Sequence, residues 1–237
     1  MTYISSQTML DSNEYYVIYQ PIVHLTTGHV LGNEALLRHK SYTPRTLHEV
    51  MVKRGLLANL DMLRILIGLE EAPVGTVTIN VMPSSIIALA NDRFNVSLDV
   101  IRGIKPAADV VWEINSSEQV SPDEEELFQH SVRRLRDEGY RFAVDNLGKG
   151  YSSLLTFSNI EPEIVKIDRT TVLNLSKRFV RGLLSSVLSL SNELSFLLVF
   201  EGCDDKKTTA LIKELGATYG QGDFIGLPVD AKSRKGN

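Results

Sequence analysis

Six polar residues of this sequence occupy the same kind of position and belong to types that bind metal ions or move protons. Each lies at or near the end of a short, mostly apolar segment that resembles a β-strand. They are Glu34, Asn80, Glu113, Asp145, Lys166 and Glu201. Carboxylate and amide oxygens suit hard cations such as Mg²⁺ or Mn²⁺, and clustered buried acids repel one another without a cation. One polar residue at a strand end is usually just solvated, but six together favour a metal site.

A glycine-containing loop follows one of these residues. The apolar segment ends at Asp145, and Gly148 and Gly150 come directly after it. Glycine permits the backbone turns that let a strand-end acid face a ligand. This stretch alone is weak evidence, and its weight comes from the repetition of the arrangement along the chain.

Strand-like and helix-like segments alternate along nearly the whole chain. The predicted strands are 15–23, 29–37, 74–81, 109–114, 142–145, 164–167, 197–201, 218–219 and 224–225. The predicted helices are 46–71 with a break near Gly55, a short one from Pro83, 122–138 behind a capping box of Ser121 and Glu124, 151–157, 175–193 and 205–215. This alternation predicts an α/β fold, a TIM-like (β/α)8 barrel, with an open doubly wound sheet as the alternative. The first two strands form a hairpin, so one strand of the barrel should be antiparallel.

Size and composition narrow the class of protein. The chain has 237 residues and a net charge of −4, which does not favour binding to a nucleic acid polymer. It has no apolar run of membrane-spanning length and no secretory signal, and its only cysteine, Cys203, excludes an internal disulfide framework. We therefore expect a cytoplasmic protein without membrane contact. We expect a lead-in at 1–14, one barrel domain at 15–228 and a disordered tail at 229–237.

At these residues the sequence resembles the EAL domain family of cyclic-di-GMP phosphodiesterases. The matching motifs occur in the order that the family shows. They are Tyr19-Gln20-Pro21-Ile22, Glu34-Ala35-Leu36-Leu37-Arg38, Ile79-Asn80-Val81-Met82-Pro83, Trp112-Glu113-Ile114, Asp145 to Leu154, Val165-Lys166-Ile167-Asp168-Arg169, Glu201-Gly202 and Tyr219-Gly220-Gln221-Gly222. Together they span almost the whole chain.

The resemblance implies a barrel of EAL type that cleaves cyclic-di-GMP to linear pGpG with two Mg²⁺ or Mn²⁺ ions. It assigns the first metal to Glu34, Asn80, Glu113 and Asp145, and Asn146 stands where an aspartate serves the second metal. It makes Glu34, Lys166 and Glu201 the catalytic residues, with Lys166 orienting the attacking water. It places Gln20 at a guanine edge, Arg38 at a phosphate, and Asp168 and Gln221 beside the substrate.

The sequence departs from the family pattern around the second metal. Asn146 supplies an amide oxygen without negative charge, Ser116 stands where a glutamate braces the metal-site loop, and Lys149 replaces a threonine. Loss of such outer support typically lowers metal affinity or activity by about 10–100-fold. Glu118 lies nearby, but its spacing does not match the missing brace.

Three functions follow from these observations. The first is a degenerate domain that binds cyclic-di-GMP with weak or absent hydrolysis and acts as a receptor or protein-interaction module. The second is an active phosphodiesterase, and the third is a protein-binding scaffold without nucleotide. The helix at 175–193 is expected to pack on the barrel, with a homodimer contact as its alternative role.

Overall fold

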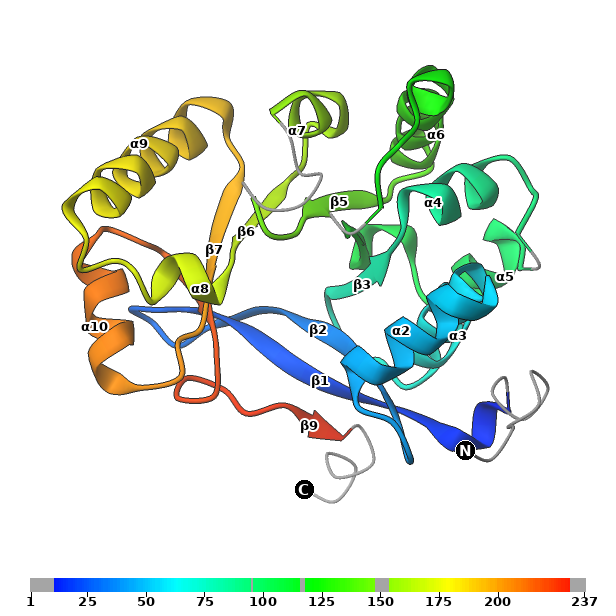
Figure 1. Cartoon of the computed structure of the whole chain (residues 1–237), viewed down its shortest axis with the longest axis horizontal. Coiled ribbons are helices and arrows are strands. Elements are labelled where there is room, and N and C mark those ends of the chain that lie inside the picture. The colour runs from blue at the N-terminus through cyan, green and yellow to red at the C-terminus, as the bar shows by residue number, and fades with distance from the viewer. Residues whose placement is uncertain (1–10, 95, 116–117, 148–153, 231–237) are drawn as a thin grey trace.

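The computed structural model describes residues 11–94, 96–115, 118–147 and 154–230, and these residues form a closed barrel (Figure 1). The strands of the barrel are β1 (Tyr15–His24), β2 (Val30–His39), β3 (Val77–Val81), β4 (Val110–Ile114), β5 (Arg141–Val144), β6 (Ile164–Ile167), β7 (Leu197–Glu201) and β8 (Tyr219–Gln221). Strands β2 to β8 follow one another in parallel pairs. Strand β1 closes the ring by antiparallel pairing with both β2 and β8. The predicted barrel with one antiparallel strand is therefore confirmed.

Helices lie around the outside of the strands (Figure 1). They are α2 (Pro44–Arg54), α3 (Leu57–Glu70), α4 (Pro83–Ala90), α5 (Leu98–Ile104), α6 (Glu125–Asp137), α7 (Leu154–Ile160), α8 (Arg169–Val172), α9 (Arg178–Leu194) and α10 (Lys206–Glu214). Short 3-10 turns occur at Ser12–Glu14, Ala107–Asp109 and Pro122–Glu124. The predicted break near Gly55 is confirmed, because this residue ends α2 in a left-handed conformation (φ +66°).

Several local predictions differ from the structure. Residues 224–225 lie in a turn, and the last strand is instead β9 (Val229–Asp230), which pairs with Ile18 and Tyr19 of β1. Helices α5 and α8 were not predicted. Both helices are short, so their sequences show too little of the helical hydrophobic periodicity to be recognised.

The capping box predicted before α6 is not formed. Pro122–Glu124 is a 3-10 turn, and the Ser121 hydroxyl donates to the Glu124 carboxylate (2.7 Å) instead of accepting from a backbone N–H. The remainder of the predicted tail, 231–237, and the first ten residues of the predicted lead-in lie outside the described residues.

The apolar strands and the inner faces of the helices form the core. All five residues of β4 are buried, as is usual for parallel strands that are covered on both faces. Trp112 of this strand is fully buried. The buried Tyr19 hydroxyl donates to the Gly68 carbonyl (3.0 Å), which ties β1 to α3. In the described part of the chain, no helix has the length and apolar character needed to span a membrane.

Candidate functional site

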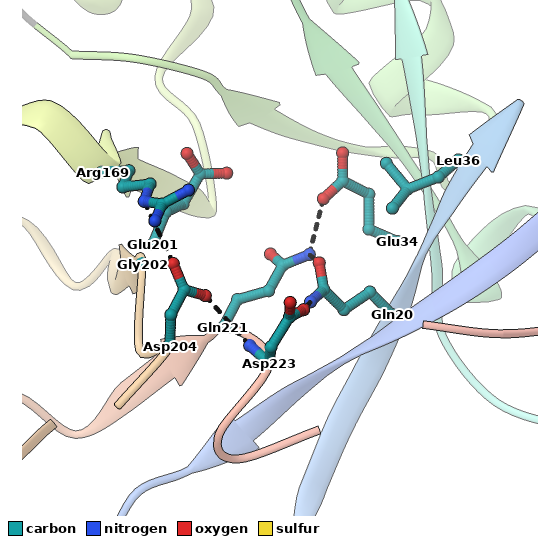
Figure 2. Close-up of a pocket in the computed structure, with 10 residues that line it drawn as sticks. Gln20, Glu34, Leu36, Arg169, Glu201, Gly202, Asp204, Gln221 and Asp223 are labelled. Carbon is teal, nitrogen blue, oxygen red and sulfur yellow. Dashed lines mark hydrogen bonds and ion pairs between the residues drawn. The ribbon is translucent and has the colours of Figure 1, made fainter. Parts of the chain in front are cut away.

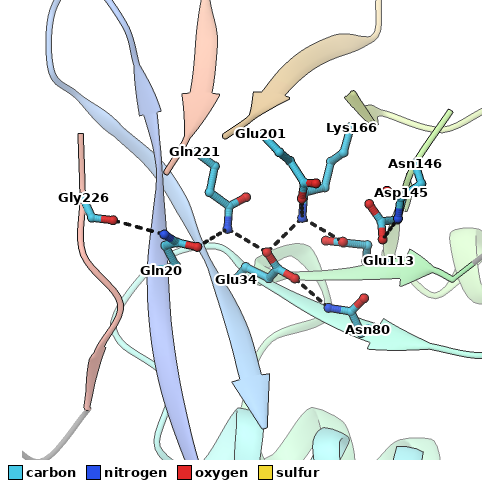
Figure 3. Close-up of polar contacts among 10 residues, drawn as sticks. All are labelled: Gln20, Glu34, Asn80, Glu113, Asp145, Asn146, Lys166, Glu201, Gln221 and Gly226. Atoms are coloured by element: carbon cyan, nitrogen blue, oxygen red, sulfur yellow. Dashed lines mark hydrogen bonds and ion pairs between the residues drawn. The ribbon is translucent and has the colours of Figure 1, made fainter. Parts of the chain in front are cut away.

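Strand register brings the predicted polar residues together at one end of the barrel. Asn80 of β3 pairs with Glu113 of β4, and Gln20 of β1 pairs with Glu34 of β2. On the other side of the ring, Glu201 of β7 pairs with Gln221 of β8. Figure 3 shows the side chains of these residues directed toward a common centre.

Lys166 lies at that centre. Its ammonium nitrogen is 2.8 Å from Glu34 Oε2, 2.9 Å from Glu113 Oε1 and 2.8 Å from Glu201 Oε1 (Figure 3). The Lys166 side chain is 1% exposed, whereas that of Glu201 is 25% exposed. The lysine is therefore a buried counter-charge shared by three carboxylates from three strands.

Glu34 connects Lys166 to the neighbouring side-chain amides. Its Oε1 accepts from Asn80 Nδ2 (2.7 Å), and its Oε2 accepts from both Lys166 and Gln221 Nε2 (2.7 Å). Gln221 Nε2 also donates to Gln20 Oε1 (3.2 Å), and Gln20 in turn donates to the Gly226 carbonyl (3.4 Å). Five predicted residues thus form one connected network.

The electrostatics of the cluster follow from burial and from its charge balance. Burial alone would raise the pKa of Glu34, but the Lys166 ammonium and the amides of Gln221 and Asn80 hold it below its ordinary value. Burial and the neighbouring Glu34 raise the pKa of Glu113 well above the ordinary range. Burial would lower the pKa of Lys166, but the surrounding carboxylates raise it well above its usual value, so this lysine stays charged.

Asp145 and Asn146 follow β5 at the edge of the cluster. Burial raises the pKa of Asp145 to about 7, with contributions from Glu201 and Glu34. Asn146 has a left-handed backbone (φ +55°), which asparagine tolerates better than most residues. Its side-chain amide donates to Asp145 Oδ2 (Figure 3). The residue beside Asp145 therefore presents an amide N–H to this carboxylate and brings no charge of its own.

A pocket of about 410 Å³ opens beside the network (Figure 2). Its lining includes four of the predicted residues, which are Gln20, Glu34, Glu201 and Gln221. It also includes residues that were not predicted as site residues, which are Leu36, Arg169, Gly202, Asp204, Gly222 and Asp223.

Three of these additional residues are linked. Arg169 Nε lies 3.0 Å from Asp204 Oδ2, and Asp204 Oδ1 accepts from the Asp223 backbone N–H (3.0 Å). Asp223 Oδ1 accepts from Gln20 Nε2 (3.3 Å). Figure 2 shows this chain of contacts along the pocket wall. The position of Asp204 just after β7 was the sequence signal that could have identified it.

Two predicted substrate-binding residues lie apart from the pocket lining. Arg38 Nη1 donates to the Leu37 carbonyl (3.0 Å), and burial lowers its pKa from the ordinary value. Asp168 is the N-cap of α8 and accepts from the backbone N–H groups of Thr170 (2.6 Å) and Thr171 (3.3 Å). Its carboxylate also accepts from both threonine hydroxyls.

Two of the departures noted in the sequence, Ser116 and Lys149, lie outside the described residues. The nearby Glu118 has a separate partner, because its Oε2 accepts from the Ser84 backbone N–H (2.8 Å) at the start of α4. Cys203 is buried, and burial raises the pKa of its thiol to about 11, which fits a residue that packs in the core.

A divalent cation such as Mg²⁺ needs several oxygen ligands directed at one point. Among the described residues, no three histidine, cysteine or acidic side chains are arranged to hold a metal ion, because the carboxylates converge on Lys166. The chemistry of the donors nevertheless fits a hard cation. Three carboxylates contact one ammonium, that of Asp145 lies near it, and Glu113 Oε2 is buried without a hydrogen-bond partner in the described structure.

The comparison with protein families matches the EAL domain over residues 5–228. Among curated proteins, the chain is 29% identical over 238 residues to an uncharacterized signaling protein of Caulobacter vibrioides, covering 92% of this chain and 28% of that protein. It is 27% identical over 239 residues to the cyclic di-GMP phosphodiesterase RocR of Pseudomonas aeruginosa, covering 93% and 59%. The chain thus spans less than two thirds of the length of these relatives.

The fold agrees with solved structures of EAL proteins. The EAL enzyme Bd1971, in its cAMP- and cyclic-di-GMP-bound form, superposes with a TM-score of 0.81 at 21% identity, over 96% of this chain and 65% of that chain. The manganese and cyclic-di-GMP complex of Klebsiella pneumoniae BlrP1 gives a TM-score of 0.76 at 21% identity, over 92% and 57%. At this level of identity the likeness establishes the shared fold.

Proposed function

Because the chain belongs to the EAL domain family, we propose that it binds cyclic-di-GMP at the carboxyl end of its barrel and hydrolyses it slowly or not at all. Such a domain acts as a receptor or a protein-interaction module. The observation that carries the proposal is the contrast between Lys166, which sits in a complete ring of carboxylates, and Asn146, which brings an uncharged amide to the same cluster.

The pocket supports the binding half of this proposal. Gln20 has an amide that both donates and accepts, which suits the edge of a guanine base. Arg38 is assigned to a phosphate, for which the planar guanidinium fork is suited. In the structure the Arg38 guanidinium donates to a backbone carbonyl, and this contact is weak enough to be replaced by a contact with a phosphate. Two similar proteins support this choice of ligand, because RocR is a cyclic di-GMP phosphodiesterase and Bd1971 has been solved with cyclic-di-GMP bound.

The charge of the pocket implies that binding needs a cation. Its lining contains the acidic residues Glu34, Glu201, Asp204 and Asp223, with Arg169 as the basic residue. A ligand with two phosphodiester groups would be repelled by this lining at neutral pH. Mg²⁺ or Mn²⁺, held by Glu34, Asn80, Glu113 and Asp145, would supply the missing positive charge and polarise a phosphate oxygen. In this scheme Lys166 and Glu201 position the attacking water.

The arrangement at Asn146 supports weak hydrolysis. An aspartate at this position would offer a charged oxygen to a second cation, whereas Asn146 directs its N–H toward Asp145. An amide oxygen brings no negative charge, so both the affinity for a second cation and the acidity of its bound water should fall. A site with two cations, which two-metal hydrolysis of a phosphodiester requires, would then form less readily.

An active phosphodiesterase is the second candidate function. It is favoured by the complete set of first-metal residues and by the central position of Lys166, with Glu201 partly exposed toward the pocket. A protein-binding scaffold without nucleotide is the third candidate.

The test incubates the chain with cyclic-di-GMP and Mg²⁺ or Mn²⁺, separates the nucleotides over time, and measures binding by calorimetry with Ca²⁺. We expect binding that is lost with a chelator and little or no pGpG. Steady pGpG formation would establish the active phosphodiesterase. If cyclic-di-GMP does not bind with any of these cations, the protein-binding scaffold is the remaining function.

Two sets of variants test the assigned roles. Arg38→Ala should weaken binding without changing secondary structure. Asn146→Asp together with Ser116→Glu restores the carboxylate for the second cation and the glutamate that braces its loop. If their loss is what weakens catalysis, the double variant should raise the rate of hydrolysis at least about tenfold. Unchanged hydrolysis in the double variant would contradict this account of the defect, and unchanged affinity in Arg38→Ala would contradict the phosphate assignment.

A further inference from the structure

The side-chain amides of Gln221 and Gln20 have a fixed direction within the polar network (Figure 3). Gln221 Nε2 donates to Glu34 Oε2 (2.7 Å) and to Gln20 Oε1 (3.2 Å), so both of its hydrogens are used. Gln20 Nε2 donates to Asp223 Oδ1 (3.3 Å) and to the Gly226 carbonyl (3.4 Å). Because an ionised carboxylate only accepts, Glu34 sets the direction of the first amide, and the first amide sets that of the second.

The oxygens of these two amides remain for a ligand. Gln221 Oε1 is buried and has no hydrogen-bond partner in the described part of the chain. Gln20 Oε1 accepts from Gln221 and keeps a second lone pair. Both side chains line the pocket of about 410 Å³. The two amides therefore offer a ligand acceptors, because their N–H groups are already engaged.

Asp223 adds a carboxylate to the same side of the pocket (Figure 2). Its Oδ1 accepts from Gln20, and its backbone N–H donates to Asp204 Oδ1 (3.0 Å). The charge of Asp204 is balanced by Arg169, whose Nε lies 3.0 Å from Asp204 Oδ2. Among the residues that the structure describes, none forms an ion pair with Asp223 or donates to its Oδ2. The carboxylate is thus held in place with one oxygen free, and we call this oxygen and the two amide oxygens the acceptor wall.

An acceptor wall selects a ligand by the hydrogens that the ligand presents. The Watson–Crick edge of guanine carries two adjacent donors, N1–H and the 2-amino group, and a carboxylate has enough lone pairs to accept from both. Hypoxanthine keeps N1–H but lacks the 2-amino group. Adenine presents a lone pair at N1 beside its 6-amino group, and a carboxylate repels that lone pair. The wall therefore suits guanine better than either of the other two bases.

We propose that Asp223 makes this pocket selective for guanine, by accepting from N1–H and the 2-amino group of one base of cyclic-di-GMP. The inference rests on the proposed function, because it concerns how the ligand of the same pocket is recognised. Gln20 holds the carboxylate in position and contributes its own amide oxygen beside it. Hydrogen bonds to an ionised group are roughly twice as strong as neutral ones, so Asp223 contributes most of the selection.

Calorimetry of the chain with Ca²⁺ and three cyclic dinucleotides tests the selection. The ligands are cyclic-di-GMP, its hypoxanthine analogue cyclic-di-IMP, and cyclic-di-AMP. Cyclic-di-GMP should bind at least about tenfold more tightly than cyclic-di-IMP, because the analogue lacks one charge-assisted hydrogen bond. It should bind at least about 100-fold more tightly than cyclic-di-AMP, whose adenine edge leaves the carboxylate facing a lone pair.

The variant Asp223→Asn keeps the shape of the side chain and replaces one acceptor by an N–H. The preference for cyclic-di-GMP over cyclic-di-IMP should fall to about threefold or less. An amide matches the donor and the acceptor of the adenine edge, so the affinity for cyclic-di-AMP should rise at least about threefold. A gain of affinity cannot come from loss of folding. Circular dichroism checks the fold, which should be kept because Asp223 is exposed in a turn.

Asp204→Asn is the matched control, because it removes the same charge from the same side of the pocket. Its side-chain oxygen can still accept from the Asp223 N–H. The control should change the affinity for all three ligands by a similar factor and leave their ratios unchanged. Unchanged ratios in Asp223→Asn, or ratios that change as much in the control, would overturn the role of Asp223 while binding of cyclic-di-GMP upheld the proposed function. Binding of none of the three ligands would overturn the proposed function and this inference with it.

Discussion

Replacement of Lys166 by methionine removes the one ammonium group that three carboxylates share. Methionine keeps most of the volume of the lysine stem, so the change acts mainly on charge. Glu34 and Glu113 are 8% and 0% exposed and cannot be compensated by water, whereas Glu201 is 25% exposed and is partly screened. The variant should therefore leave two buried carboxylates without a counter-charge.

The expected cost follows from the burial of these groups. Removal of one partner of a buried ion pair typically destabilises a protein by about 3–5 kcal/mol. The raised pKa of Glu113 means that this carboxyl takes up a proton more readily than an ordinary glutamate, so we expect the lower end of that range, about 3 kcal/mol. In a chain of this size, such a loss corresponds to a fall in melting temperature of about 6–12 °C.

The loss should depend on pH in a defined direction. Without Lys166, the folded-state pKa of Glu34 rises above the unfolded value of about 4.3, and that of Glu113, which is already raised, rises further. The folded variant then binds more protons than the unfolded chain between that value and its raised pKa, so its stability falls as pH rises through this window. The difference from the native protein should therefore be largest near pH 7.5 and smaller near pH 5.5.

Urea unfolding at these two pH values, with a chelator present, measures the effect. Lys105→Met is the matched control, because Lys105 is also buried but contacts a carbonyl, that of Pro73 (3.0 Å), and leaves no carboxylate behind. We expect Lys105→Met to lower the free energy of unfolding by about 1.5–2 kcal/mol, and by the same amount at both pH values. The reasoning is refuted if Lys166→Met costs no more than Lys105→Met at pH 7.5, or if its cost is the same at both pH values.

Three other outcomes are expected. Gly222→Ala should lower the free energy of unfolding in urea by at least ~2 kcal/mol, because the new Cβ would lie 2.4 Å from the Cys203 backbone. Gly103→Ala is the control, because the space around Gly103 is free and the substitution should not destabilise the chain. Asp168→Ala should cost about 1–2 kcal/mol in the same assay through loss of the α8 cap, and an equal stability would argue against that role. The Cys203 thiol, whose pKa is about 11, should react with a disulfide reagent at about pH 8 only as fast as the chain unfolds.

The architecture could be predicted because its signals are local. Each parallel strand is a short apolar run, and each ends at or near a polar residue, so the alternation with helices indicates a barrel whose carboxyl ends share these residues. The errors fall where local signals are short. Residues 224–225 have strand-like composition but lie in a turn, and the pairing of β9 with β1 joins segments about 200 residues apart. No local pattern specifies a pairing over that distance.

The sequence by itself determined which residues gather at the end of the barrel, because strand order and the position of each residue along its strand are enough to bring Glu34, Glu113, Lys166 and Glu201 together. Only the tertiary structure decided how they pair. Lys166 and Glu34 are 132 positions apart, and their contact depends on closure of the whole ring. Side-chain partners across such distances depend on geometry that the order of residues along the chain does not express.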